Sequence, residues 1–318
     1  MPEIYTKDQN GKLKSLGNVN ASNLIDTSTL DEYLKSFWSD NKSGKHSGMA
    51  KKHKELLERN LIAKPEDLFE QLNSNTFTFQ NFGPMKLANF LKNAKLDSYL
   101  KQEYVEDALG VITPQPSIGK GEFLLVSCFK NINFSQESGD LIDDNGNRIE
   151  VKGSHAPIGG VKGFEQMNKG IMFSVYRLFG TNPDSEDLTM KCAKDIQQKL
   201  EDNADVRKKV LLLLQNNSKK SDHLAEEMLE LFNEKIFKGT EKEKEDLLLN
   251  IVAAAHLYAY LKMQKANFLF AVNDKIFAGF ETPKTLKQSY EIIKDNFKVN
   301  GWTTGNRGIT FTLTIKAG

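Results

Sequence analysis

The first 109 residues carry apolar side chains at helical spacing. Residues 29–38 place four of them on one helical face, and a serine or threonine is available to cap the first turn. At 65–72 a proline followed by two acids opens a second helix, because proline suits the first helical position and acids suit the positive end of the helix dipole. Residues 86–100 again show a helical pattern. We therefore expect an α-helical N-terminal module over residues 1–109.

The pattern changes near residue 110, where turn-forming residues precede short apolar runs. Such runs, bounded by Gly, Asn and Asp, are typical of strands, whereas residues 185–265 are mostly helical in pattern. For residues 110–318 we expect an α/β fold of the α+β kind, with a mixed central sheet and a helical insertion at about 185–265. The segments expected to build this sheet lie near 123–152 and 268–315.

An Asn-Gly step between two apolar segments predicts a β-hairpin. Its register depends on the turn. A two-residue loop makes Asp140 face away from Glu150, whereas a three-residue or bulged loop places them opposite each other. The second register also gathers Leu141, Ile149 and Val151 on one apolar face. We therefore expect the longer turn.

Charged residues on this hairpin suggest a chemistry. Glu150 and Lys152 stand two positions apart on one strand and so project from one face, and Asp140 adds a second carboxylate in the expected register. Adjacent carboxylates repel each other unless a cation lies between them, and Mg²⁺ prefers carboxylate oxygens together with water and phosphate. Lys152 can hold or help to deprotonate an attacking water and can meet charge on a phosphate. The set suits phosphodiester hydrolysis.

Gly139-Asp140, followed on the next strand by Glu150-Val151-Lys152, resembles the signature of the PD-(D/E)xK nuclease superfamily. Glu122, in the segment Gly-Lys-Gly-Glu, is similar to the acidic residue that members often carry on the first core helix. The resemblance covers residues 119–166. It implies a restriction-endonuclease-like fold, in which helices flank a mixed central sheet, and a Mg²⁺-dependent endonuclease that hydrolyses DNA, with Mn²⁺ as a substitute ion.

The resemblance assigns a role to each of four residues. Asp140 and Glu150 would hold the metal, Glu122 would complete or support its shell, and Lys152 would orient the nucleophilic water. An ordinary interpretation exists for the same residues. Glu and Lys can alternate on the water-facing side of an exposed hairpin, and an acid at a helix start is favoured by the dipole alone.

Basic residues away from acids are the candidates for contact with DNA. Residues 41–54 contain no acid, and lysines there would release counterions from a phosphate backbone without reading its sequence, although a solvated helix face has the same composition. The segment 301–308 is either a nucleotide-binding loop or a hairpin connection. The resemblance adds Gln166, at a position after the motif where some members carry a residue that contacts the substrate. The full set of candidates is Lys42, Lys45, Lys51, Lys52, Lys54, His155, Gln166 and Arg307.

Composition narrows the class of protein without naming a partner. The chain has 318 residues, of which 39% are hydrophobic and 27% charged, values that fit a folded globular protein and exclude a disordered or fibrous one. There are 43 Lys and Arg against 42 Asp and Glu, a net charge of +1, so any basic surface must be local. Cys128 and Cys192 support neither a disulfide framework nor a thiolate zinc site.

No membrane partner is expected from the sequence. The apolar stretch 251–261 contains His256 and is shorter than the roughly 18 residues that suggest a spanning helix. The N-terminus has no apolar segment behind a basic start, so no secretory signal is expected. We expect a cytoplasmic protein, located in the host cytoplasm if the chain is encoded by a bacteriophage, whose proteins it resembles in general texture.

Two further functions stay open at this point. The chain could be a catalytically inactive nucleic-acid-binding or virion-associated structural protein that keeps a nuclease-like fold. It could also be a metal-dependent phosphodiesterase acting on RNA or on a small nucleotide. For the endonuclease, double-stranded DNA is the expected partner. A homodimer could cut both strands, whereas a monomer most simply nicks one.

Overall fold

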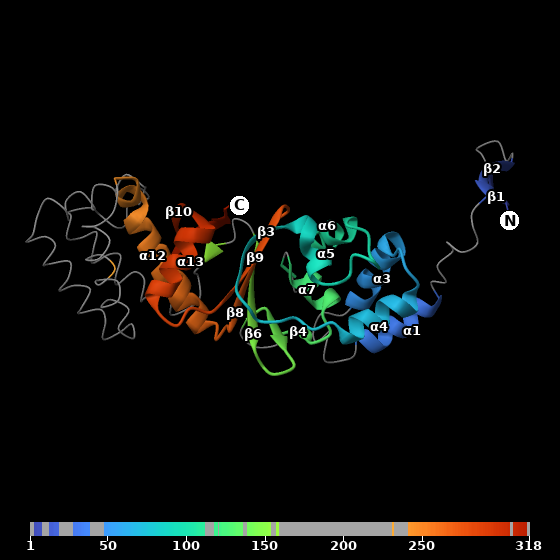
Figure 1. Ribbon diagram of the computed structural model, residues 1–318, viewed down its shortest axis with the longest axis horizontal. Coiled ribbons are helices and arrows are strands. Elements are labelled where there is room, and N and C mark those ends of the chain that lie inside the picture. The colour runs from blue at the N-terminus through green and yellow to red at the C-terminus, as the bar shows by residue number, and fades with distance from the viewer. Residues whose placement is uncertain are drawn as a thin grey trace, which may run out of the picture.

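The computed structural model of the chain describes most of residues 28–153 and most of residues 241–316, which lie far apart in the sequence (Figure 1). The described residues are 3–7, 13–18, 28–38, 48–111, 118–119, 121–135, 139–153, 157–158, 231, 241–305 and 308–316. For some residues in these helices and strands only the backbone is described.

A six-stranded mixed sheet forms the centre of the fold, with strand order β3-β9-β8-β6-β5-β4. Strands β6 and β8 run parallel, and the other neighbouring pairs are antiparallel. A parallel pair needs a crossover connection, and α12 (Glu241–Met263) lies between these two strands in the chain. The strands are β3 (Phe82–Lys86), β4 (Ile132–Phe134), β5 (Leu141–Asp143), β6 (Arg148–Gly153), β8 (Phe268–Val272) and β9 (Ile276–Glu281).

Helices cover both faces of this sheet. Figure 1 shows α12 and α13 (Leu286–Asn296) on one side and α7 (Glu122–Cys128) with the earlier helices on the other. All five residues of β8 are buried, as expected for a strand covered on both faces, and this explains its continuous apolar sequence. The expected α/β class, with a mixed sheet flanked by helices, is therefore confirmed.

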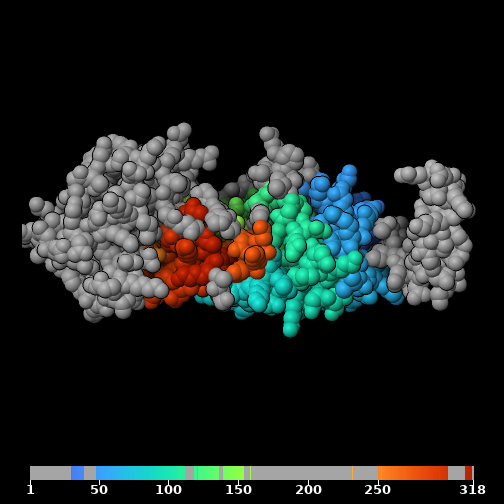
Figure 2. Space-filling model, turned by 90° about the horizontal axis from the view of Figure 1, so that it is seen from above, coloured from blue at the N-terminus to red at the C-terminus, as the bar shows by residue number. Residues whose placement is uncertain are grey.

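The N-terminal helices share one hydrophobic core with the sheet. Trp38, at the end of the first helix, stacks on Phe123 of α7 with ring centroids 5.9 Å apart, and the core cluster continues to Phe277 of β9. In the space-filling view the blue and cyan surface of these helices continues directly into green and orange segments (Figure 2). The division of the chain into an N-terminal module over residues 1–109 and a second domain over 110–318 stays a prediction. The helices are α1 (Ser28–Phe37), α3 (Met49–Asn60), α4 (Pro65–Ser74), α5 (Phe90–Asn93) and α6 (Glu103–Leu109).

The first two predicted helices are confirmed, but the third is shorter than expected. Residues 86–100 contain only a 3₁₀ turn (Leu87–Asn89) and α5. Lys95 adopts a positive φ of 56°, and Leu96 N donates to Leu91 O. This is the geometry in which a left-handed residue closes a helix, so the helical pattern ends early.

Two expectations about the sheet are wrong. The apolar run at 123–126 belongs to α7, because all its side chains are buried and a short buried run does not distinguish a helix from a strand. Strands β10 (Phe297–Gly305) and β11 (Gly308–Ile315) do not join the central sheet but form a separate three-stranded sheet with β7 (Pro157–Ile158). They could not extend the central sheet at β9, since β3 already occupies the free edge of β9.

Other expectations are tested only in part. Gly305 pairs with Gly308, so the segment 301–308 is a hairpin end, as one of its two interpretations predicted. Of the helical insertion, Leu231 and α12 are described, and α12 is helical as expected. A small antiparallel hairpin joins β1 (Glu3–Lys7) to β2 (Leu13–Asn18). Among the described helices, none combines the length and the hydropathy that crossing a bilayer requires.

Candidate active site

The β5–β6 hairpin has the register predicted from the sequence. Leu141 pairs with Ile149, and Asp143 N donates to Asn147 O at 2.9 Å, so a three-residue loop connects the strands. Gly146 closes this loop at a φ of 84°. The Asp143 carboxylate accepts hydrogen bonds from the backbone N–H groups of the loop, at 3.0 and 2.7 Å. This turn fixes which residues of the two strands face each other.

Asp140 lies where the two strands stop pairing. It precedes β5, and the bend before it uses a positive φ of 77° at Gly139. Its backbone N donates to Ile149 O at 3.1 Å, while its Oδ2 accepts from Val151 N at 2.8 Å. The Asp140 carboxylate thus takes the place of a strand partner for β6, and it is held beside the segment that carries Glu150 and Lys152.

Glu150 and Lys152 project from β6 toward α12. Lys152 Nζ lies 2.7 Å from Glu150 Oε1, and the two side chains are 20% and 3% exposed. The Tyr260 hydroxyl of α12 donates to the same Oε1, and Lys152 Nζ lies 4.9 Å from the centroid of the Tyr260 ring. Ile149 and Val151, on the other side of the strand, join the core. The Glu-x-Lys pair is therefore buried under a helix and is not on a water-facing hairpin.

Glu122 is the first residue of α7 and reaches the site because this helix begins very close to the sheet. Gly121, the residue before the helix, has a φ of 90°, and a Cβ there would lie 2.6 Å from Val272 Cγ1 and 3.2 Å from Val151 Cγ1. Only glycine satisfies both the angle and the approach. Gly119 N donates to Glu122 Oε1 at 2.8 Å and orients the side chain.

Burial and neighbouring charges raise the pKa values of two of these carboxyls, Glu122 and Asp140. Burial, followed by the charge of Asp140, raises the pKa of Glu122 to about 8. Burial and the charge of Glu150 raise the pKa of Asp140 to about 6, although Lys152 and the bond from Val151 N oppose this rise. Shifts of this kind arise where like charges share a poorly solvated space.

The pKa values of the two hydrogen-bond donors near Glu150, Lys152 and Tyr260, are also raised. Burial, the largest single effect, would lower the pKa of Lys152, but the charge and hydrogen bond of Glu150 together with Tyr260 and the charge of Asp140 outweigh it and hold that pKa above its usual range. Burial and then the charge of Glu150 raise the pKa of the Tyr260 hydroxyl. Lys152 therefore stays an ammonium ion at neutral pH, and Tyr260 stays a neutral donor.

The donor chemistry of this cluster fits a hard divalent cation, since three carboxyls share one lysine. Coordination is not preformed, however. Among the residues that the structure describes, no group of three or more His, Cys, Asp or Glu side chains is arranged to hold a metal. Glu150 Oε1 already accepts from Lys152 and Tyr260. In this arrangement Lys152 supplies the positive charge that balances the acids.

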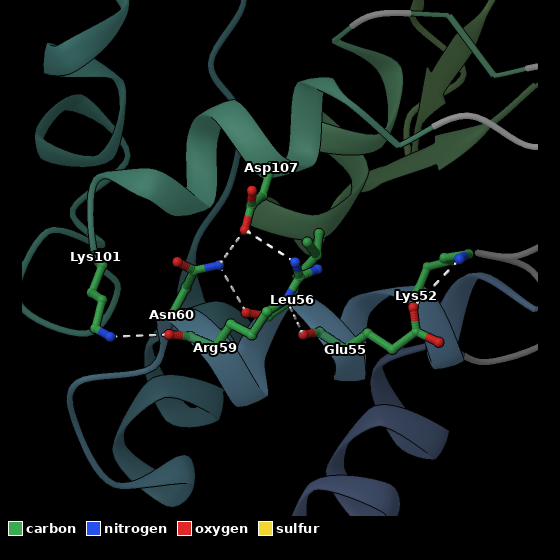
Figure 3. Close-up of polar contacts among 7 residues, drawn as sticks. All are labelled: Lys52, Glu55, Leu56, Arg59, Asn60, Lys101 and Asp107. Carbon is green, nitrogen blue, oxygen red and sulfur yellow. Dashed lines mark hydrogen bonds and ion pairs between the residues drawn. The ribbon is translucent and has the colours of Figure 1, made fainter.

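The lysines predicted to contact DNA are only partly described. On α3, Lys54 Nζ lies 2.6 Å from Asp31 Oδ2, and Lys52 Nζ lies 3.4 Å from Glu55 Oε2. Figure 3 shows the Lys52–Glu55 pair beside a network that links α3 to α6. Two of these lysines therefore have acidic partners, whereas Lys51 is exposed. Their contact with DNA stays a prediction. The remaining candidates, Lys42, Lys45, His155, Gln166 and Arg307, lie outside the described residues.

Sequence reasoning did not indicate Tyr260 as a site residue. It lies on the apolar helix α12 and is 5% exposed. The available signal was the phenol itself, because a buried tyrosine usually finds a partner for its hydroxyl. The partner could not be named from the sequence, since the two residues are separated by 110 positions.

Comparison of the chain with protein-family models, curated proteins and solved structures finds no match. Function must therefore be inferred from the site itself.

Proposed function

We propose that this protein is a Mg²⁺-dependent endonuclease that hydrolyses phosphodiester bonds of DNA. The observation that carries the proposal is the convergence of Glu122 at the start of α7, Asp140 just before β5, and Glu150 and Lys152 on β6, at the point where β5 and β6 separate. Buried acids that raise one another's pKa destabilise a fold unless a positive charge balances them. Their grouping at one place therefore favours a functional site.

The fold supports the same proposal. An acid at the start of a helix is followed in the chain by an antiparallel hairpin that carries Asp140 and the Glu-x-Lys pair, within a mixed sheet covered by helices on both faces. This is the arrangement that the resemblance to PD-(D/E)xK nucleases implies. A restriction-endonuclease-like fold is therefore part of the proposal.

Each residue has a role that its surroundings support. Asp140, Glu150 and Glu122 would hold Mg²⁺ or Mn²⁺, which when bound polarises the scissile phosphate. Lys152, kept protonated, orients the attacking water through an N–H donor and meets negative charge that develops on the phosphate. Burial under α12 lowers the local dielectric and strengthens both interactions.

One observation favours the second candidate, an inactive nucleic-acid-binding protein with a nuclease-like fold. Lys152 already neutralises Glu150 through an ion pair at 2.7 Å, so the charge of Glu150 is balanced without a metal. The two functions differ in what divalent cations do. In the endonuclease, the cation must bind among the acids and change the partners of Glu150, whereas in the inactive protein it has no effect.

A plasmid assay distinguishes these functions. Purified protein is incubated with supercoiled DNA over a range of Mg²⁺ and Mn²⁺ concentrations, and nicked and linear products are measured together with the oligomeric state. We expect cleavage by the wild type and at least an approximately 100-fold loss in Asp140→Asn and Glu150→Gln. Asp107→Asn, a matched change on α6, should cut like the wild type.

Three results would count against the proposal. Wild-type protein that gives no product with either ion supports the inactive protein. Asp140→Asn or Glu150→Gln variants that cut normally show that the site is misassigned. Cleavage of RNA or of a dinucleotide, without cleavage of DNA, supports the other phosphodiesterase.

A further inference from the structure

Tyr260 contacts both members of the Glu-x-Lys pair from a separate element. Its hydroxyl donates to Glu150 Oε1, and its ring lies beneath the Lys152 ammonium, with 4.9 Å between Nζ and the ring centroid. Of these three residues, two come from β6 and one from α12. The side chain is 5% exposed, so these contacts form in a poorly solvated space where hydrogen bonds to a charged group are strong.

The position of Tyr260 is fixed by the packing of α12. The buried Ser289 hydroxyl of α13 donates to Ala254 O at 2.8 Å, so α12 is tied to α13 six positions before Tyr260. Lys152 is confined as well. Together with Phe297 and Leu313 of the second sheet it lines a cavity of about 10 Å³, which is too small for a ligand.

We propose, as an inference that rests on the proposed nuclease function, that Tyr260 is a positioning residue of the metal site. Tyr260 and Lys152 both contact the Glu150 carboxylate at Oε1, so a cation held by Glu150 would use Oε2. The phenol fixes the rotation of the carboxylate and thus the direction in which Oε2 points. The ring holds the ammonium of Lys152 above it by a cation–π contact.

The test separates the hydroxyl of Tyr260 from its ring. Tyr260→Phe keeps the ring and removes the donor, and Tyr260→Leu removes both. Tyr258→Phe is the matched control, because it removes a hydroxyl from the same helix that does not contact Glu150. For each variant, Mn²⁺ binding is measured by calorimetry without DNA, melting temperature is recorded, and plasmid cleavage is followed as Mg²⁺ is raised.

We expect Tyr260→Phe to bind Mn²⁺ about 10- to 100-fold more weakly than the wild type. Its cleavage should recover as Mg²⁺ is raised, and its melting temperature should fall by only a few degrees, like that of Tyr258→Phe. Tyr260→Leu should additionally cut more slowly at saturating Mg²⁺, because Lys152 loses its support. Tyr258→Phe should bind Mn²⁺ like the wild type.

The outcomes distinguish this inference from the proposed function. Equal or tighter Mn²⁺ binding by Tyr260→Phe, in a background where the wild type binds Mn²⁺ and cuts DNA, overturns the positioning role alone. An equal loss of affinity in Tyr258→Phe also overturns it, since the effect would then be a general one of α12. Wild-type protein that neither binds Mn²⁺ nor cuts DNA overturns the nuclease proposal and this inference together.

Discussion

Two charged clusters of this protein each pair a basic side chain with an acidic one, and they differ in their surroundings. On the surface, Arg59 Nη1 lies 3.9 Å from Asp107 Oδ2, and the side chains are 62% and 35% exposed. Under α12, Lys152 and Glu150 lie 2.7 Å apart and are 20% and 3% exposed. Water screens the first pair and hardly reaches the second, so only the second can perturb its neighbours strongly.

The polar side chains of the surface cluster are also paired with one another and with backbone carbonyls by hydrogen bonds of ordinary length. Asn60 Nδ2 donates to Asp107 Oδ2 at 2.9 Å and to Leu56 O at 3.0 Å, and Lys101 Nζ donates to Arg59 O at 3.1 Å (Figure 3). This network joins α3 to α6. In the buried cluster three acids, Glu122, Asp140 and Glu150, share the single cation of Lys152. The comparison teaches that charge imbalance combined with burial, rather than the number of charges, distinguishes the region that we propose as the active site.

The largest expected effect comes from removing the cation of the buried cluster. In Lys152→Met the apolar stem is kept, but Glu150 loses its ion-pair partner, so we expect a loss of about 3 kcal/mol in the free energy of unfolding and a 10²- to 10⁴-fold loss of cleavage. Urea unfolding and the plasmid assay measure the two effects. An unchanged free energy of unfolding would show that the ion pair between Glu150 and Lys152 does not stabilise the fold.

A smaller effect is expected from the acid on α7 and depends on pH. Folding raises the pKa of Glu122 from 4.5 to about 8, so the folded state binds more protons than the unfolded state between these values, and stability falls as pH rises through this range. Glu122→Gln should flatten that decline and be more stable than the wild type at pH 8, by on the order of 2 kcal/mol.

Thermal unfolding between pH 5 and pH 8 provides the measurement for this acid. Glu106→Gln, an exposed change on α6, serves as the control and should keep the slope of the wild type. A Glu122→Gln variant with the wild-type slope would show that Glu122 ionises as freely in the folded state as in the unfolded chain.

The smallest effect is expected at the surface cluster. Arg59→Ala removes the exposed ion pair with Asp107 and should change the free energy of unfolding by less than about 1 kcal/mol, with cleavage unaffected. A urea titration in low and high salt measures this. If Arg59→Ala lowered the free energy of unfolding as much as Lys152→Met does, the contrast between the two clusters would be lost.

Local rules were enough to predict the hairpin and its acids. The Asn-Gly step and the apolar face shared by Leu141, Ile149 and Val151 selected one register, and that register places Asp140 beside β6. The helices at the N-terminus followed from spacing and from Pro65 in the same way. Short-range patterns succeed here because turn chemistry and a single apolar face determine the outcome.

Features that depend on distant segments were not predictable. The apolar run that follows Glu122 is buried on all sides and so carries no period, and only the resemblance placed Glu122 on a helix. Strand β9 pairs with β3, which precedes it by some two hundred positions, and not with β10 or β11, as the bond between Asn81 and Glu281 illustrates. Tyr260 and Asp31 meet their charged partners only after the chain has folded.

The parallel alignment of β6 with β8 affects the order in which the site can be completed. The first contact between these strands, from Arg148 N to Asn267 Oδ1, spans 119 positions, and closing so long a segment is slow compared with forming the β5–β6 hairpin. During synthesis, Glu150 and Lys152 leave the ribosome long before Tyr260 and β8 exist. A nascent chain thus carries its acids in an open hairpin, and the Glu150–Lys152 pair gains its contact with Tyr260 only after α12 and β8 have been made.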